Sequence, residues 1–149
     1  MMANIFDIAG SGMAAQNLRL NLIASNLANA NSTSSESGEA YRAKQPLFSA
    51  VLENTRGVTE PRVPGAGGGR NTAAAGVRVA GVVADQRPLP LRYDPGHPHA
   101  NEAGYVEMSN VNMVTEMANM MAASRSYQSN VEIMNSSRQL MLRTLQIGR

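Results

Sequence analysis

Two histidines come nearest, in residue type and spacing, to a site that could bind a metal ion. His97 and His99 flank Pro98, and Asp94 and Glu102 lie nearby. Imidazole and carboxylate groups are common zinc ligands, but a zinc site needs at least three that converge on one point. A His-Pro-His segment is extended, and its spacing compels no third ligand. We therefore expect these side chains to stabilise a turn through hydrogen bonds, and we expect no metal and no cofactor.

Serine and glycine are common in the chain, but neither forms a catalytic or nucleotide-binding motif. There is no Gly-x-Ser-x-Gly elbow, and the two histidines are the only candidates for a general base of that type. Ser124 and Ser126 flank Arg125 in a segment with helical periodicity, where such side chains are usually solvated or contact a neighbour. The glycines of residues 65–69 miss the G-x-G-x-x-G pattern, because Arg70 stands where the last glycine belongs. We therefore expect neither an enzyme nor a small-molecule substrate.

Composition and charge exclude further classes of protein. The chain has 149 residues, of which 43% are apolar and only 4% aromatic, a balance that favours striped helices over a compact enzyme core. Its net charge of +2 is spread thinly, so nucleic acid is not an expected partner. No cysteine is present, which excludes disulfides. The first twenty residues are interrupted by polar side chains and resemble neither a cleaved signal peptide nor a membrane span.

The first thirty residues predict an amphipathic helix that begins at residue 4. Asn4 is its expected N-cap, and Asp7 lies three positions later, at the positive end of the helix dipole. An apolar row with intervals of three and four follows, broken only by Gln16, and a second apolar row flanks it. The apolar surface is thus wider than a two-stranded seam requires. The members of the first row are Phe6, Ala9, Met13, Leu20, Ile23, Leu27 and Ala30.

Residues 112–147 predict one long helix of about 54 Å, at about 1.5 Å per residue. Asn112 is the expected N-cap, and Gly148 is the expected stop. A row with 4-3 spacing runs to the end of this segment, and eight of its ten members are apolar, as is typical of a coiled coil. The row contains Met113, Met117, Met120, Ser124, Tyr127, Val131, Met134, Arg138, Met141 and Leu145.

The middle of the chain predicts less regular structure. Residues 31–56 combine a polar break with an extended segment, in which Pro46 argues against an interior strand. Residues 57–76 have the Gly/Ala/Pro composition of a flexible loop. Residues 77–110 predict a small β region, in which a turn over residues 94–98 separates two short strands.

These patterns predict an α+β fold in which the helices of residues 1–30 and 111–149 pack as an antiparallel coiled-coil-like pair. Each helix carries more apolar surface than one partner can bury, so we expect the surplus to meet other copies or related subunits. A plain helical hairpin with a Met-rich core, which needs no neighbour, is the alternative. Buried asparagines could also set the register between helices. The expected assembly interface contains Phe6, Met13, Leu20, Ile23, Asn26, Leu27 and Asn29 of the first helix, and Met113, Met117, Met120, Tyr127, Val131, Met134, Met141 and Leu145 of the last.

Four segments resemble the axial family of the bacterial flagellum, which contains the rod proteins and the hook. They are "ASNLANANS", "YRAKQPLF", "YDPGHPHANEAGYVEMSNVN" and "MAASRSYQSNVEIMNSSRQLMLRTLQIG". The first motif indicates only the axial family, whereas the last two point to its proximal-rod members. Ser109 departs from the family, which usually has proline there, and the insert at residues 54–76 is longer and richer in glycine than expected.

The resemblance implies a structural subunit of the basal-body rod, which transmits torque for motility and needs no cofactor. It implies copies of the same chain, other proximal and distal rod proteins and an export-gate adaptor as partners. It also implies unfolded passage through the flagellar type III export apparatus, without a cleaved signal, to the periplasmic rod. Folding would then be coupled to assembly, because a helix that cannot bury its apolar stripe alone stays disordered. The alternative is a helical or chaperone-like module that pairs with a transient client.

Overall fold

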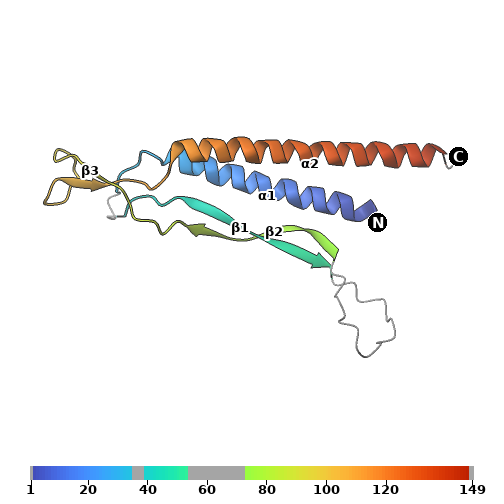
Figure 1. Cartoon of the computed structure of the whole chain (residues 1–149), viewed down its shortest axis with the longest axis horizontal. Coiled ribbons are helices and arrows are strands. Elements are labelled where there is room, and N and C mark those ends of the chain that lie inside the picture. Colours follow the sequence, from blue (N-terminus) through green and yellow to red (C-terminus); the bar gives the residue numbers. More distant parts are fainter. Residues whose placement is uncertain (1, 35–38, 54–72, 148–149) are drawn as a thin grey trace, which may run out of the picture.

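Two long helices lie side by side and run in opposite directions (Figure 1). The computed structural model describes residues 2–34, 39–53 and 73–147. Its elements are α1 (Met2–Ala28), β1 (Lys44–Glu53), β2 (Ala73–Ala84), β3 (Leu91–Tyr93), β4 (Tyr105–Glu107) and α2 (Met113–Ile147). The predicted α+β class, with helices at the two ends of the chain and strands between them, is confirmed.

The register of the helix pair follows from two close approaches. Asn26 of α1 hydrogen-bonds Glu116 of α2, and a Cβ added to Gly12 of α1 would lie 2.9 Å from the amide nitrogen of Asn130 of α2. The facing residue numbers add to 142 in both cases (26 with 116, and 12 with 130). The same register places Met2, the first residue of α1, opposite Leu140. The last turns of α2 therefore extend past α1, as Figure 1 also shows.

The start of α1 differs from the prediction, whereas the start of α2 agrees with it. α1 begins at Met2, so Asn4 lies inside the helix and is not its N-cap, and no acidic residue lies in the first turn. Methionine and alanine are good helix formers, which explains why the helix continues upstream of Asn4. At α2, Asn112 Oδ1 accepts a hydrogen bond from Thr115 N–H at 3.1 Å, which confirms the predicted cap. The predicted stop at Gly148 lies outside the described residues.

β1 and β2 form a two-stranded antiparallel ribbon, which we call the long ribbon. Pro46 is tolerated in β1 because both strands of such a ribbon are edge strands. Residues 73–76, which the sequence placed in the flexible loop, are the first residues of β2, and the rest of that predicted loop lies outside the described residues. β2 pairs back to β1 and not to the strands that follow it, so the strands of residues 77–110 belong to two separate sheets.

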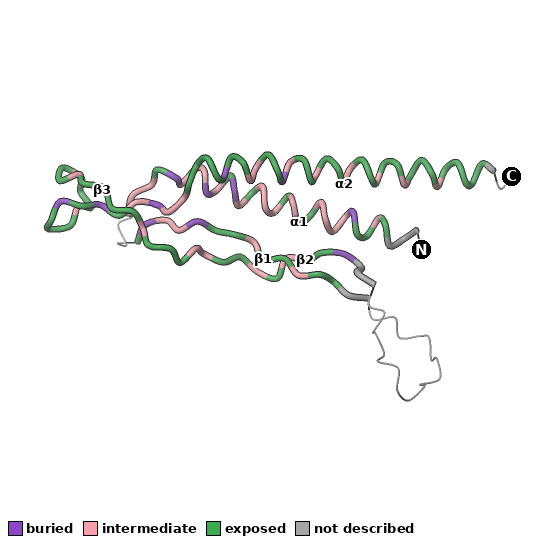
Figure 2. The backbone as a smooth tube through the Cα atoms, in the orientation of Figure 1, coloured by how far each residue is buried: buried purple, intermediate pink, exposed green. Residues whose placement is uncertain are grey.

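α1 lies between α2 and the long ribbon, as Figures 1 and 2 show, and the ribbon comes very close to it. Ser11 Oγ of α1 accepts a hydrogen bond from Val77 N–H of β2 at 3.1 Å. Gly76 permits this approach, because it has φ +150° and an added Cβ would lie 2.6 Å from Ser11 Oγ.

The buried apolar core is thin (Figure 2). Six of its eight described residues are alanines, and the other two are Ile23 and Val106. Alanine lets helices and strands approach closely, but each buried alanine removes little apolar surface from water. The alanines of this core are Ala9, Ala15, Ala30, Ala40, Ala43 and Ala123.

β3 and β4 form a second antiparallel pair, the short ribbon, at the end of the molecule far from the C-terminus (Figure 1). The predicted turn over residues 94–98 is confirmed: His97 N–H donates to Asp94 O at 3.2 Å, and His97 Nδ1 accepts from His99 N–H at 3.2 Å. Within the described part of the chain, no three His, Cys, Asp or Glu side chains are grouped to hold a metal ion. Nor is any described helix long and apolar enough to cross a membrane.

Candidate assembly surfaces

A buried asparagine joins α1, β1 and α2 at one point. Asn26 is only 1% exposed, and its side chain makes four hydrogen bonds. Nδ2 donates to Lys44 O at 2.9 Å and to Glu116 Oε2 at 3.1 Å, while Oδ1 accepts from Lys44 N–H at 2.9 Å and from Tyr41 O–H at 3.0 Å. An amide that bonds both backbone groups of one residue fixes that residue in position and register. The buried-asparagine role expected from the sequence is thus found within the subunit.

A second asparagine continues this junction at the start of α2. Asn110 Oδ1 accepts from Ala43 N–H at 2.8 Å, and Nδ2 donates to Asp85 O at 3.3 Å and Arg87 O at 3.4 Å. Arg42 donates to the same two carbonyls, at 3.3 and 3.1 Å. The end of the long ribbon at which β1 begins and β2 ends is therefore tied to the segment that enters α2, and the sequence patterns pointed to neither contact.

Asp85 and Arg87 form the ion pair of this junction. Arg87 Nη2 and Nε lie 2.6 and 2.7 Å from Asp85 Oδ2. The hydrogen bonds from the Arg87 side chain and backbone lower the pKa of Asp85 below its ordinary value of 3.8, and the same carboxylate raises the pKa of Arg87. Both partners lie near the surface and only two residues apart, so the pair shapes the local turn and not the core.

The covered side of α2 is wider than the predicted row. Met120, Tyr127, Met134 and Met141 of that row are half-buried, and so are Ser124 and Val131, whereas Met117 and Arg138 are exposed and the residue before each of them is covered. The reason is that small or hydrogen-bonding side chains, not the most apolar ones, occupy the closest contacts. The inward row is Glu116, Met120, Ala123, Tyr127, Asn130, Met134, Ser137 and Met141, all buried or half-buried.

The expected interface residues divide between covered and open positions. In α1, Ile23 and Asn26 are buried, and Phe6, Met13, Leu20, Leu27 and Asn29 are half-buried. In α2, Met120, Tyr127, Val131, Met134 and Met141 are half-buried, whereas Met113, Met117 and Leu145 are exposed. Five further exposed apolar residues of α2 were not expected at an interface: Val114, Met121, Ile133, Leu140 and Leu142.

Seven of these eight exposed side chains form two patches on α2, and Ile133 lies between them. Val114 and Met121 are seven residues apart on the side of α2 away from α1, and they are 78% and 70% exposed. Met113 and Met117 are also exposed and flank these two residues on the same turns of the helix. We call these four residues the outer patch. The second group, Leu140, Leu142 and Leu145, begins opposite the first residue of α1 and continues along the turns of α2 that extend past it, and we call it the end patch.

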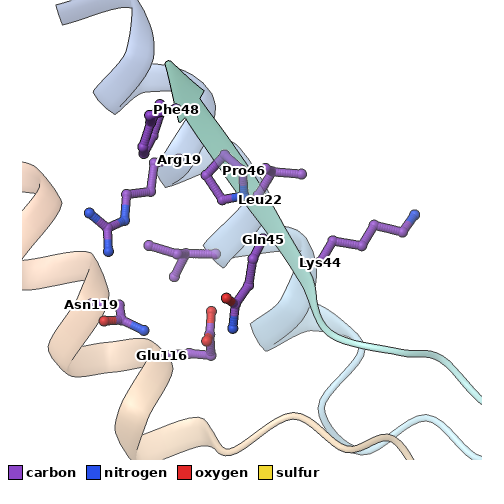
Figure 3. Close-up of a pocket in the computed structure, with 9 residues that line it drawn as sticks. Arg19, Leu22, Lys44, Gln45, Pro46, Phe48, Glu116 and Asn119 are labelled. Atoms are coloured by element: carbon purple, nitrogen blue, oxygen red, sulfur yellow. The ribbon is translucent and has the colours of Figure 1, made fainter. Parts of the chain in front are cut away.

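An open groove of about 300 Å³ lies between β1 and α2, with α1 as its floor (Figure 3). Its lining is mixed, because Arg19 and Lys44 carry positive charge while Leu22 and Phe48 are apolar. No set of side chains in it provides a nucleophile with an adjacent base. The lining residues are Arg19, Leu22, Ile23, Lys44, Gln45, Pro46, Phe48, Glu116 and Asn119.

Comparison with known protein families gives matches at both ends of the chain. Residues 6–34 match the family described as flagella basal body rod protein, and residues 102–147 match the flagellar basal body rod FlgEFG protein C-terminal family. These matches contain most of α1 and all of α2.

Full-length relatives agree with the family matches. The flagellar basal-body rod protein FlgC of Salmonella typhimurium is 48% identical over 147 residues, which are 99% of this chain and 98% of that protein. The FlgC protein of Yersinia enterocolitica is 45% identical over 147 residues, with the same coverage. That of Borreliella burgdorferi is 37% identical over 147 residues, or 95% and 93% of the two chains. The chain therefore belongs to the FlgC family of flagellar basal-body rod proteins.

Proposed function

We propose that this rod subunit joins copies of itself and related rod proteins by burying the apolar surface that its own fold leaves open, and that the resulting shaft transmits torque. The observation that carries the proposal is the outer patch of α2. Its four large apolar side chains are exposed although they belong to the same long helix whose other side packs on α1. Full burial of one such side chain contributes about 1.5–3 kcal/mol, so a neighbour that covers the patch gains several times that amount.

The thin core supports the same proposal. A core made mainly of alanine supplies little of the apolar burial that must offset the conformational entropy of about 120 ordered residues. Contacts between subunits would supply the rest, and folding would then accompany assembly. A chain of this kind suits unfolded transport through the flagellar type III export apparatus to the periplasmic part of the rod. Its partners there would be copies of itself, proximal and distal rod proteins and an export-gate adaptor.

The helix pair suits the mechanical part of the proposal. α2 has 35 residues and is therefore about 52 Å long. The junction at Asn26 ties its first turn to both α1 and β1. A force applied to the long ribbon would thus reach the helix pair through hydrogen-bonded contacts and not through a free hinge.

Substitution in the outer patch tests the proposal. Met121→Asp places a charge where we expect an apolar neighbour, and we expect it to abolish both motility and recovery of the subunit in purified basal bodies. Met121→Leu keeps the apolar surface and should retain both. Ser129→Asp adds the same charge at an exposed polar position of α2 and serves as the charge control. Normal recovery of the Met121→Asp subunit in basal bodies would refute the proposed role of the outer patch.

A further inference from the structure

We propose that Met113, Met117 and Met121, the three methionines of the outer patch, form an oxidation site that controls the joining of subunits. Oxidation of these residues to methionine sulfoxide blocks the contact that covers the outer patch and leaves the subunit itself folded. The inference rests on the proposed function, because it assigns a chemical modification to the surface that a neighbour covers.

The composition of the chain directs mild oxidants to methionine. The chain has ten methionines and neither cysteine nor tryptophan. Thiols, which react with peroxides and then form disulfides, are therefore absent, and the methionine thioether is the side chain that such oxidants convert. Because the sulfur atom must meet the oxidant, the exposure of each methionine determines how fast it reacts.

The fold divides the methionines of α2 into two groups. Met113, Met117 and Met121 are 40%, 50% and 70% exposed and follow one another at intervals of four residues, so their side chains are neighbours along the helix. The other three methionines of α2 belong to the inward row that faces α1, where they are half-buried. Those three are Met120, Met134 and Met141. Since two adjacent residues fall into different groups, the side of the helix separates the groups and the local sequence does not.

The reaction needs only a two-electron oxidant such as hydrogen peroxide. The sulfur lone pair attacks one peroxide oxygen, the O–O bond breaks as the S–O bond forms, and the second oxygen leaves as water. The sulfur is oxidised to the sulfoxide, and the peroxide is reduced. A methionine sulfoxide reductase reverses the step with a dithiol, which becomes a disulfide while the sulfoxide oxygen leaves as water.

A sulfoxide at the outer patch affects the assembly and the fold differently. In the free subunit the new S=O group remains in contact with water, so the folded state loses little free energy relative to the unfolded state. In the rod the same group would lie against an apolar neighbour, and burial of a polar group without a hydrogen-bond partner is unfavourable. Three such groups on one patch therefore weaken the contact between subunits. A sulfoxide in the inward row would instead lie between α1 and α2 and weaken the fold.

Peroxide oxidation of the purified full-length chain tests the site. The reaction is performed in a sucrose buffer, which favours the folded state, and peptide mass spectrometry measures the sulfoxide at each position. We expect the three outer-patch methionines to oxidise at least about fivefold faster than the three inward ones. In concentrated urea all six methionines of α2 should react within about twofold of one another, because the fold no longer covers any of them.

Two results of this experiment would overturn the inference. One is an equal rate of oxidation for outer and inward methionines in the folded chain. The other is loss of the helical circular dichroism signal when only the outer-patch positions carry sulfoxide, since the modification would then act on the fold. A retained helical signal supports the inference, together with the return of these positions to methionine on treatment with the reductase and a dithiol.

Substitution tests the effect on assembly in cells. Glutamine resembles methionine sulfoxide, because both are unbranched and carry a polar oxygen, whereas leucine keeps the apolar surface and cannot be oxidised. Met113→Gln, Met117→Gln and Met121→Gln together should reduce recovery of the subunit in basal bodies at least about tenfold. The corresponding triple leucine variant should retain recovery within about twofold. The matched control adds three glutamines at exposed positions on another side of α2: Thr115→Gln, Ala122→Gln and Ser129→Gln.

Peroxide in the growth medium links these substitutions to oxidation itself. Rods that form during exposure to sublethal hydrogen peroxide should contain at least about threefold less of the parent subunit than of the leucine variant. Equal recovery of these two chains would overturn the inference, as would normal recovery of the glutamine variant or an equal loss of the control variant. The proposed function fails separately: normal recovery of Met121→Asp refutes it, whereas loss of Met121→Asp with normal recovery of the glutamine variant refutes only the oxidation site.

Discussion

Replacing Asn26 by aspartate exchanges one amide group for a carboxylate of the same shape at the junction of α1, β1 and α2. The amide nitrogen of Asn26 lies 3.1 Å from Glu116 Oε2 and 2.9 Å from Lys44 O, so the introduced oxygen would face two acceptors instead of donating to them. A lost donor beside a buried acceptor costs about 1–3 kcal/mol. Two unit charges about 4 Å apart repel by about 4 kcal/mol at an effective dielectric constant of about 20. We expect Asn26→Asp to lower the free energy of unfolding by the sum of these two contributions, about 5–7 kcal/mol.

A double-mutant cycle isolates the contribution of the Glu116 contact. Glu116→Gln keeps an oxygen that accepts from Asn26, so it should change the free energy of unfolding by less than about 1 kcal/mol. In the Glu116→Gln background, the new amide at position 116 can donate a hydrogen bond to the carboxylate introduced by Asn26→Asp. The loss of free energy of unfolding caused by Asn26→Asp should therefore be smaller by about 2–4 kcal/mol. Asn21→Asp is the matched control, because it makes the same exchange on the exposed side of α1.

The assay is urea unfolding of the four chains at pH 7, followed by circular dichroism at 222 nm. A fixed concentration of sucrose, which stabilises the folded state, keeps the parent chain folded over a measurable range of urea concentration. A coupling energy below about 0.5 kcal/mol between positions 26 and 116 would refute the contact and the register that depends on it. An equal cost for Asn21→Asp and Asn26→Asp would refute the claim that burial at the junction causes the effect.

Three further predictions concern single positions. Gly76→Ala should lower the free energy of unfolding by at least about 2 kcal/mol, because its φ is +150° and its Cβ would touch α1, whereas Gly81→Ala in the same strand, with open space around it, should change it by less than about 1 kcal/mol. Gly10→Ala should raise the free energy of unfolding by up to about 1 kcal/mol, since an added Cβ in this helix would meet no atom within 4 Å. Urea unfolding measures the effect of both glycine substitutions. Because Arg87 lowers the pKa of Asp85, the pair should stabilise the fold above pH 3.8 and lose this effect as the pH falls through the lowered pKa. The carboxyl carbon of Asp85 should titrate below 3.8 by NMR, and Arg87→Gln should raise its pKa toward that value, because the side-chain hydrogen bond is lost while the backbone hydrogen bond from residue 87 remains; an unchanged titration would contradict the prediction.

Local patterns were sufficient to predict the parts of the fold that depend on neighbouring residues. The 4-3 spacing of the last segment predicted α2, and Asn112 predicted where it begins, because a cap acts on backbone groups within one turn. The residue types of 94–98 predicted the turn of the short ribbon in the same way. The surplus of apolar residues also predicted that some would remain exposed, which the outer and end patches of α2 confirm.

Contacts between segments that are distant in the sequence determined the other parts of the fold. β1 pairs with β2 across residues 54–72, and no local pattern encodes a pairing between such distant segments. The inward row of α2 contains Glu116, whereas the more apolar Met117 beside it is exposed, because helices that approach closely select small or hydrogen-bonding side chains at their contact points. Asn26 likewise occupies a buried position because three elements together satisfy all of its hydrogen bonds. Periodicity along one chain segment thus determined which residues form helices, and the close packing of separate segments determined which side of each helix is covered.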